Sequence, residues 1–340
     1  MYKILVVGPS WIGDTVLAQP LFHLLHEKHG TAAIDVLAPA WTLPVLERMP
    51  EVRHTLLNPF GHAELRLRAR RRLGRELAIA GYNQAIVLPN SFKSALVPFF
   101  AAIPLRTGYR GEMRWGLLND VRALDEQALP RMVERYAALA SAPAEPPPPP
   151  PPLGLRVAEA ARLATLAKLR IDPGAVAVAL CPGAEYGPAK RWPLHHFAAL
   201  GKALAKKGLE VWIVGSARER GLGEEIEKLA DSACRNLCGM TTLAEAIDVL
   251  ASAALVVSND SGLMHVAAAV GRPLIALYGS SSPEFTPPHA ADARIVRLGL
   301  ECSPCFEREC PLGHFNCMMQ LTPERVCSAI DFDKIRPRPR

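Results

Sequence analysis

The feature that most constrains this chain of 340 residues is a run of seven consecutive prolines within the segment SAPAEPPPPPPP, Ser141–Pro152. Proline has a fixed φ and no backbone N–H, so such a run cannot enter a helix or the middle of a sheet. It predicts a semi-rigid polyproline spacer of roughly 3 Å per residue. We therefore expect an N-terminal domain at 1–142, a linker at 143–152, a C-terminal domain at 153–321 and a C-terminal helix or tail at 322–340, and the length fits two domains.

Short apolar runs alternate with helical patterns on both sides of this spacer. The predicted strands are Lys3–Val7, Ile34–Leu37, Ala85–Leu88, Val176–Leu180, Glu210–Val214, Leu255–Ser258 and Pro273–Tyr278. Strands that alternate with helices are typical of a doubly wound parallel sheet. The sequence thus predicts two similar α/β halves, and in such folds we expect ligands in the cleft between the halves.

The charge is concentrated in the first half. Residues 1–142 hold 17 Lys and Arg against 12 Asp and Glu, an excess of five, whereas the remainder holds 22 against 21. Six arginines fall within Arg66–Arg75. This run fits contact with nucleic acid or with an anionic lipid head group, and it equally fits a solvated helix that faces only water. The five-residue apolar run before Gly8 is too short for a signal peptide, and no apolar run is long enough to span a membrane, so we expect a cytosolic chain.

The loop LCPGAEYGPAKRWP, Leu180–Pro193, follows one predicted strand and precedes a helical pattern at His195–Lys207. Gly183 and Gly187 allow a ligand close to the backbone, and three prolines stiffen the loop. Lys190 then lies near a helix start, which suits a phosphate. The alternative interpretation is a surface loop with a solvated Lys-Arg pair.

Two further loops follow strands in the same half. In SNDSGLMH, Asp260, Ser261 and Gly262 open a predicted helix, Leu263–Val270, whose free amides form an anion site. Asp260 either caps this helix or binds sugar hydroxyls, and a packed or capping role is favoured for His265. In GSARE, Glu219 is placed to accept hydrogen bonds from ribose hydroxyls. Together these loops predict a nucleotide-diphosphate site.

The opening loop, GPSWIGD, has neither the GxGxxG dinucleotide pattern nor the GK[ST] of a P-loop. Asp14 stands where the first strand turns into a helix predicted at Thr15–His29. Carboxylates at such turns commonly cap helices. The functional alternative is a general base at the carboxyl end of the strand.

Four of the eight cysteines cluster near the end in CSPCFERECPLGHFNC: Cys302, Cys305, Cys310 and Cys317. Disulfides are disfavoured in the cytosol, so a structural metal has to be weighed. The spacing after the CxxC does not match the paired pattern usual for zinc, and packed free thiols are favoured over metal binding.

The motifs PSWIGD, CPGAEYGPAKRWP and SNDSGLMH, with the late cysteine cluster, resemble the bacterial ADP-heptose:lipopolysaccharide heptosyltransferases of glycosyltransferase family nine. The resemblance covers about residues 3–330 and is greatest to the type II members, with types I and III as alternatives. It implies a GT-B fold, an inverting transfer without cofactor or required metal, a nucleotide-sugar donor, and an anionic Kdo-lipid A core acceptor. It also implies a cytoplasmic enzyme peripheral at the inner face of the inner membrane that binds no nucleic acid.

Carried onto this chain, the resemblance implies Asp14 as the base and Lys190 as the residue that binds the leaving diphosphate. The implied donor-binding residues are Gly183, Ala184, Glu185, Lys190, Glu219, Thr241, Asp260, Ser261, Gly262 and Leu263. The expected acceptor-binding residues are Trp11, Asn90, Lys93, Arg110 and Arg114, from the basic half. The rival hypotheses are a zinc-bearing nucleic-acid binder, which the balanced charge around the cysteines disfavours, and an inert nucleotide-binding module.

Overall fold

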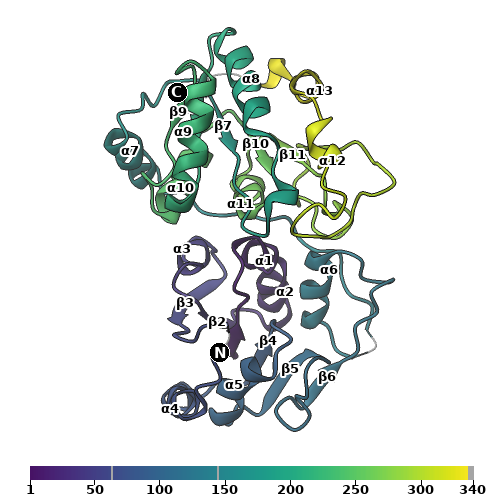
Figure 1. Cartoon of the computed structure of the whole chain (residues 1–340). Coiled ribbons are helices and arrows are strands. Elements are labelled where there is room, and N and C mark those ends of the chain that lie inside the picture. The colour runs from purple at the N-terminus through teal and green to yellow at the C-terminus, as the bar shows by residue number, and fades with distance from the viewer. Residues whose placement is uncertain (63, 144, 336–340) are drawn as a thin grey trace. The chain divides into compact units, whose positions relative to one another are not determined.

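The computed structural model describes residues 1–62, 64–143 and 145–335. The chain divides into two compact units, Met1–Leu153 and Gly154–Arg340, and each contains one sheet with helices (Figure 1). The segment predicted as a linker clusters with the first unit, and the predicted tail clusters with the second. Residue 144 of that linker and residues 336–340 of that tail lie outside the described residues.

The first unit contains a parallel sheet of six strands in the order β3-β2-β1-β4-β5-β6. Its strands are β1 (Lys3–Val7), β2 (Ala33–Ala38), β3 (Val52–Leu57), β4 (Gln84–Val87), β5 (Leu105–Tyr109) and β6 (Asp120–Arg122). Its helices are α1 (Ile12–Leu17), α2 (Gln19–His29), α3 (Leu43–Leu46), α4 (Leu67–Ala78), η1 (Phe92–Ala95), α5 (Leu96–Phe100), α6 (Met132–Ala137) and η2 (Ala138–Ala140).

The single helix predicted at Thr15–His29 is wrong, because the structure divides this stretch into α1 and α2. Pro20 is the cause, since it has no N–H with which to continue the hydrogen bonds of α1. Within the first turn of α2 that missing donor costs nothing, and a new helix begins there.

The second unit repeats the arrangement, with the strand order β12-β11-β10-β7-β8-β9 and every pair parallel. Its strands are β7 (Ala177–Cys181), β8 (Glu210–Ile213), β9 (Arg235–Asn236), β10 (Leu255–Asn259), β11 (Leu274–Leu277) and β12 (Ala293–Val296). Its helices are α7 (Glu159–Lys168), η3 (Pro188–Lys190), α8 (Leu194–Ala205), η4 (Ala217–Glu219), α9 (Arg220–Leu229), α10 (Leu243–Ser252), α11 (Gly262–Ala269), α12 (Asn316–Met319), α13 (Pro323–Ser328) and η5 (Phe332–Lys334).

The end of the described chain is part of the second core. Helix α13 packs beside α8 (Figure 1), and Val326 and Ile330 join the buried cluster that covers the sheet. The indole Nε1 of Trp192 donates to the carbonyl oxygen of Leu321 at 2.6 Å, which ties this segment to the loop after β7.

The two parallel sheets confirm the two α/β halves predicted from the sequence. None of the helices in the described ranges combines the length and apolar character that crossing a membrane requires.

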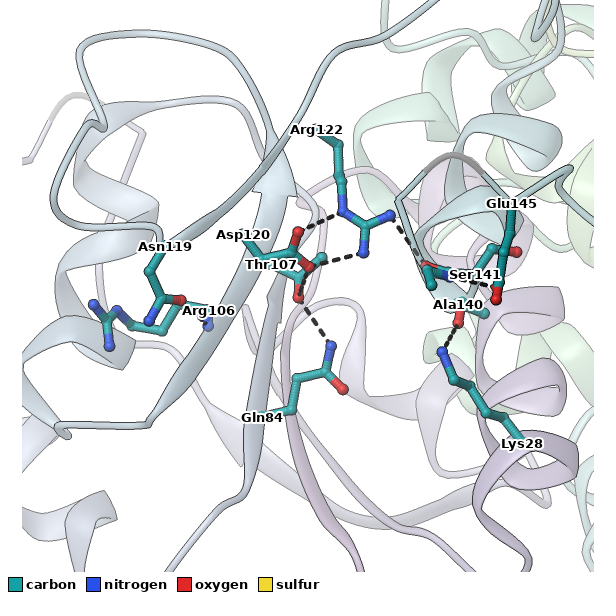
Figure 2. Close-up of polar contacts among 11 residues, drawn as sticks. Lys28, Gln84, Arg106, Thr107, Asn119, Asp120, Arg122, Ala140, Ser141 and Glu145 are labelled. Carbon is teal, nitrogen blue, oxygen red and sulfur yellow. Dashed lines mark hydrogen bonds and ion pairs between the residues drawn. The ribbon is translucent and has the colours of Figure 1, made fainter.

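A chain of polar contacts crosses the β4-β5-β6 edge of the first sheet (Figure 2). Gln84 Nε2 donates to Thr107 Oγ1 at 2.9 Å, and this hydroxyl donates to Asp120 Oδ2 at 2.9 Å. Asp120 accepts two hydrogen bonds from the guanidinium of Arg122, at 2.6 and 2.8 Å. Arg122 also donates to the carbonyl oxygen of Ser141, and so the network fastens the start of the proline-rich segment to the sheet.

The pKa of Asp120 lies below its ordinary value of 3.8. Burial alone raises this pKa, but the hydrogen bonds from Arg122 and Thr107 and the charge of Arg122 outweigh it. Because the folded pKa is depressed, the ionised carboxylate contributes stability above the unfolded pKa. That contribution is lost as the pH falls through the folded pKa.

We predict that Asp120→Ala lowers the free energy of unfolding at neutral pH by about 3 kcal/mol, because it leaves the half-buried Arg122 guanidinium without its carboxylate. Urea unfolding followed by circular dichroism measures the effect. The difference between the variant and the parent should shrink below pH 3.8. Glu76→Ala, which removes one partner of an exposed pair with Arg72, is the control and should change stability by less than about 1 kcal/mol. Equal stabilities of Asp120→Ala and the parent at neutral pH would contradict the assignment.

Candidate functional site

Three loops of the second unit follow adjacent strands at the centre of its sheet. They follow β10, β7 and β8, which lie side by side in the order β10-β7-β8. Because all pairs are parallel, the carboxyl ends of these strands meet at one edge. The chain winds in opposite directions on the two sides of β7, and ligands of open α/β sheets bind at such a switch point.

Lys190 and Asp260 join two of these loops. The Lys190 ammonium Nζ lies 2.5 Å from Asp260 Oδ2, and the side chains are only 18% and 5% exposed. The ammonium also lies 5.1 Å from the centre of the Tyr186 ring, within range of a cation–π interaction. The structure thus brings together the two residues that the sequence analysis placed at the ends of different strands.

The N-terminus of α11 lies directly after Asp260. Ser261 is its N-cap, and the side chain of Ser261 makes no capping hydrogen bond. Within the described parts of the chain, the amides of Ser261, Gly262 and Leu263 donate to no other group. These amides and the helix dipole favour an anion at this position.

Asn259, at the end of β10, holds the loop after β7 in place. Its side chain is fully buried, its Oδ1 accepts from the Trp192 amide at 3.0 Å, and its Nδ2 donates to the carbonyl oxygen of Pro182 at 2.7 Å. One amide side chain therefore fixes both ends of the loop that carries Lys190.

Glu219 connects the loops after β7 and β8. Its Oε2 accepts from the Ser216 amide at 2.6 Å as part of a capping box. A Cβ added to Gly183 would lie 1.5 Å from Glu219 Oε1, and one added to Gly215 would lie 2.9 Å from Oε2. Glycine at these two positions thus lets the carboxylate lie against the backbone of both loops.

A distant segment supports the Lys190 loop from its other side. The hydroxyl of Tyr186 donates to the carbonyl oxygen of Phe306 at 2.7 Å, and the Ala189 amide donates to that of Arg308 at 3.0 Å. A Cβ on Gly187 would lie 2.3 Å from the same Arg308 oxygen. The cysteine-rich segment, Cys302–Cys317, therefore packs against the Lys190 loop.

The four clustered cysteines are free thiols, and they line one small cavity together with His314, Ala189 and Ser280. Burial raises the pKa of the Cys317 thiol, and the nearby Cys305, Cys302 and Cys310 add to this. Within the described ranges, no three His, Cys, Asp or Glu side chains are arranged as ligands of one metal ion.

His265 is buried on α11. Burial lowers its pKa to about 4, with the charge of Asp260 opposing the shift and that of Lys190 adding to it. The ring is therefore neutral at neutral pH, and its Nδ1 has no hydrogen-bond partner in the described structure.

The other expected donor residues border the same loops. Ala184 is buried, and its carbonyl oxygen accepts from the guanidinium of Arg191 at 3.3 Å. Glu185 is exposed and pairs with Arg218 at 3.5 Å. Thr241 follows β9 and directly precedes Thr242, the N-cap of α10.

In the first unit, Asp14 lies in the first turn of α1 after β1. The N-cap is Trp11, so Asp14 does not occupy the capping position. Asp14 is half-buried and close enough to Tyr136 to add to the effect of burial, which raises the pKa of that phenol. Trp11 itself is 43% exposed.

The expected acceptor residues occupy different environments. Asn90 and Arg110 are exposed and Lys93 is half-buried, whereas Arg114 is only 3% exposed. The guanidinium of Arg114 donates to the carbonyl oxygens of Pro89 and Tyr109 and to Asn90 Oδ1. Arg114 is therefore placed to position the loop after β4.

Sequence reasoning missed the supporting residues Asn259, Tyr186 and Arg308. The sequence did contain a signal for Asn259. A polar side chain that directly follows four residues of a buried strand is itself buried and needs hydrogen-bond partners. For Tyr186 no local signal existed, because its partner Phe306 lies 120 residues away.

Two α/β units, each with a parallel sheet of six strands, form a fold of the GT-B type. The sequence profile of glycosyltransferase family 9 (heptosyltransferase) matches residues 70–316. The chain belongs to this family, and the prediction of a glycosyltransferase is confirmed.

Individual relatives match over nearly the whole length. The chain is 47% identical to lipopolysaccharide heptosyltransferase 2 of Escherichia coli K12, over 97% of each sequence. It is 46% identical to lipooligosaccharide heptosyltransferase 2 of Haemophilus influenzae, over 97% of this chain and 98% of the relative. The solved structure of E. coli ADP-heptose lps heptosyltransferase II is 46% identical, covers 96% of each chain and superposes with a TM-score of 0.85.

We predict that Gly183→Ala lowers the free energy of unfolding of the second unit by about 1 kcal/mol, because the new methyl group displaces the Glu219 carboxylate from its capping hydrogen bond with the Ser216 amide. Gly221→Ala is the matched control. Gly221 lies in α9 with open space at its Cβ position, so alanine there should stabilise by about 0.5–1 kcal/mol. Thermal unfolding of both variants measures the two effects. Equal shifts in Tm would contradict the close contact between Gly183 and the Glu219 carboxylate.

We predict that Asn259→Ala lowers the free energy of unfolding by about 2–4 kcal/mol, because the Trp192 amide and the Pro182 carbonyl both lose their buried partner. Denaturant titration gives the stability, and calorimetry with ADP gives the affinity of the folded variant. If the variant loses stability but keeps the ADP affinity of the parent, the Asn259 contacts stabilise the fold without contributing to ligand binding.

Proposed function

We propose that this chain moves L-glycero-D-manno-heptose from an ADP-heptose donor to the first heptose of the lipopolysaccharide inner core, with inversion at the anomeric carbon. Two of its relatives carry the name heptosyltransferase 2, and the solved relative is named for ADP-heptose. The observation that carries the proposal is the Lys190–Asp260 pair beside the unpaired amides of α11.

The donor diphosphate binds to Lys190 and to the amides of Ser261, Gly262 and Leu263. Cleavage of the bond between sugar and phosphate places negative charge on the departing ADP, and these groups are aimed at that charge. A preorganised donor of this kind is worth ~3–4 kcal/mol in a transition state. Lys190 and the α11 amides thus stabilise the charge of the leaving diphosphate, as a divalent cation does in metal-dependent transferases. The proposed reaction therefore requires neither a metal nor a cofactor.

Glu219 and Asp260 bind the sugar hydroxyls of the donor. Glu219 Oε2 is held by the Ser216 amide, which fixes the carboxylate while Oε1 accepts from the ribose. Ala184, Glu185 and Thr241 line the nucleoside portion, since they border the loops that position Gly183 and Glu219.

Asp14 takes the proton from the acceptor hydroxyl as its oxygen attacks the oxocarbenium-like anomeric carbon. General base catalysis of this kind contributes roughly 10²–10⁴-fold. Trp11, Asn90, Lys93 and Arg110 contact the anionic Kdo-lipid A core, and Arg114 positions Asn90.

The same acceptor defines where the enzyme works. Its lipid anchor is held in a bilayer, so we place this chain in the cytoplasm, peripheral at the inner face of the inner membrane, with no nucleic-acid partner. The excess of basic residues in the first unit fits an anionic acceptor.

Type I or type III heptosyltransferase activity is the alternative within the family. ADP release should be measured with inner-core acceptors that carry or lack the first heptose. Release only with the heptosylated acceptor supports the proposal, and release only with the non-heptosylated acceptor contradicts it.

We predict that Lys190→Met and Asp14→Asn each lower kcat at least about a hundredfold, since each removes a group that acts on the reacting atoms. Lys190→Met should also weaken ADP binding, whereas Asp14→Asn should leave it unchanged. Lys206→Met and Asp125→Asn are the matched exposed controls and should keep full activity. Unchanged turnover in both test variants, or loss of turnover on addition of EDTA, would contradict the mechanism.

A further inference from the structure

The outer face of α4, in the first unit, carries a stripe of positive charge. At 3.6 residues per turn, Arg68, Arg71, Arg72 and Arg75 project from one side of the helix, and Ile79 continues the same side just past its end. All five are exposed, and Ile79 is 90% exposed. At 1.5 Å per residue the stripe from Arg68 to Arg75 is about 10 Å long.

The opposite face fixes this helix to the molecule. Ala69, Leu73 and Leu77 pack against the buried cluster that covers one face of the first sheet. Arg70 is buried, its guanidinium lies 4.1 Å from the centre of the Phe60 ring, and it donates to three backbone carbonyl oxygens. Helix α4 also packs side by side with α5 (Figure 1). The stripe is therefore presented on a rigid support.

Most charges of the stripe are not neutralised within the unit. Arg72 pairs with Glu76 at 3.7 Å. Arg68, Arg71 and Arg75 have no acidic partner among the residues that the structure describes. Three like charges so close together repel one another, and an anionic surface relieves this repulsion.

We infer that the outer face of α4 docks the enzyme on the surface of an anionic phospholipid bilayer. The inference deepens the proposed function, because that function places the enzyme at a lipid-anchored acceptor. Guanidinium groups bind phosphates in a bidentate manner, and their aliphatic stems cover apolar surface.

Ile79 and the half-exposed Leu67 favour lipid over nucleic acid as the partner. Both add apolar area at the ends of the arginine stripe, and an exposed isoleucine gains by entering the boundary between headgroups and acyl chains. The segment Leu67–Ile79 contains no aromatic residue on which a base could stack.

The test is co-sedimentation of the full chain with vesicles of phosphatidylcholine alone or with about one third phosphatidylglycerol. We expect binding only to the anionic vesicles, weakened by salt. The triple variant Arg68→Gln, Arg71→Gln, Arg75→Gln should bind about 100-fold more weakly, at about fivefold for each charge. The triple variant Lys206→Gln, Lys207→Gln, Lys228→Gln, with the same change in net charge on exposed residues of the second unit, should bind like the parent.

A second arm tests the apolar contact. Ile79→Ser should weaken vesicle binding severalfold at high salt, and Ile79→Leu should not. Equal binding of both arginine and lysine variants would overturn the inference. So would tight binding of duplex DNA that depends on the three arginines and is indifferent to Ile79.

Activity is measured separately with a soluble acceptor freed of its acyl chains. Here the arginine variant should transfer heptose like the parent. Transfer to the soluble acceptor without vesicle binding would refute the docking surface alone, and vesicle binding without any transfer would refute the proposed function alone.

Discussion

The ion pair between Lys190 and Asp260 joins the carboxyl ends of two neighbouring strands, β7 and β10, at 2.5 Å. Both side chains are largely shielded from water, so each charge depends on the other for compensation. An ammonium has three donors, and Asp260 takes one of them. In the proposed function, the remaining donors bind a phosphate together with the amides of Gly262 and its neighbours. The carboxylate fixes the position of the lysine, and the pair joins two loops that are distant in sequence.

Such a site works only if its loops are rigid, and the structure supplies rigidity from several directions. Asn259 fixes both ends of the loop after β7 from within the sheet. Glu219 lies against Gly183 from the neighbouring loop. Tyr186 is held by a backbone carbonyl of the cysteine-rich segment. Preorganised groups need no rearrangement as charge develops, which is the condition under which electrostatic stabilisation is large. The cysteine-rich segment therefore has a structural task at the site through its backbone, whatever its thiols do.

The sequence predicted seven strands, and all of them are present. The missed strands are β5 and the four edge strands β3, β6, β9 and β12. The predicted strands are continuous apolar runs because both their faces are covered. An edge strand such as Val52–Leu57 has polar and half-exposed residues, and β9 has only two residues, so neither produces that pattern. The loops that carry Lys190 and Asp260 were predictable because glycine, proline and charge follow a buried run. Their supports were not, since a contact such as Tyr186 to Phe306 depends on the tertiary fold.

A count of charges likewise cannot say which basic residues meet a partner. The sequence does not distinguish Arg106 and Arg114 from the α4 arginines, yet each donates to backbone carbonyl oxygens of its own unit. Arg122 forms an ion pair with Asp120, and Arg70 is buried beneath its own helix. These guanidiniums stabilise loops and strand edges, because a carbonyl oxygen that is buried needs a donor. The charge left for an external anion is therefore smaller than the composition indicates. Much of it is gathered on one helix face, where neighbouring guanidiniums act together on a surface of many phosphates.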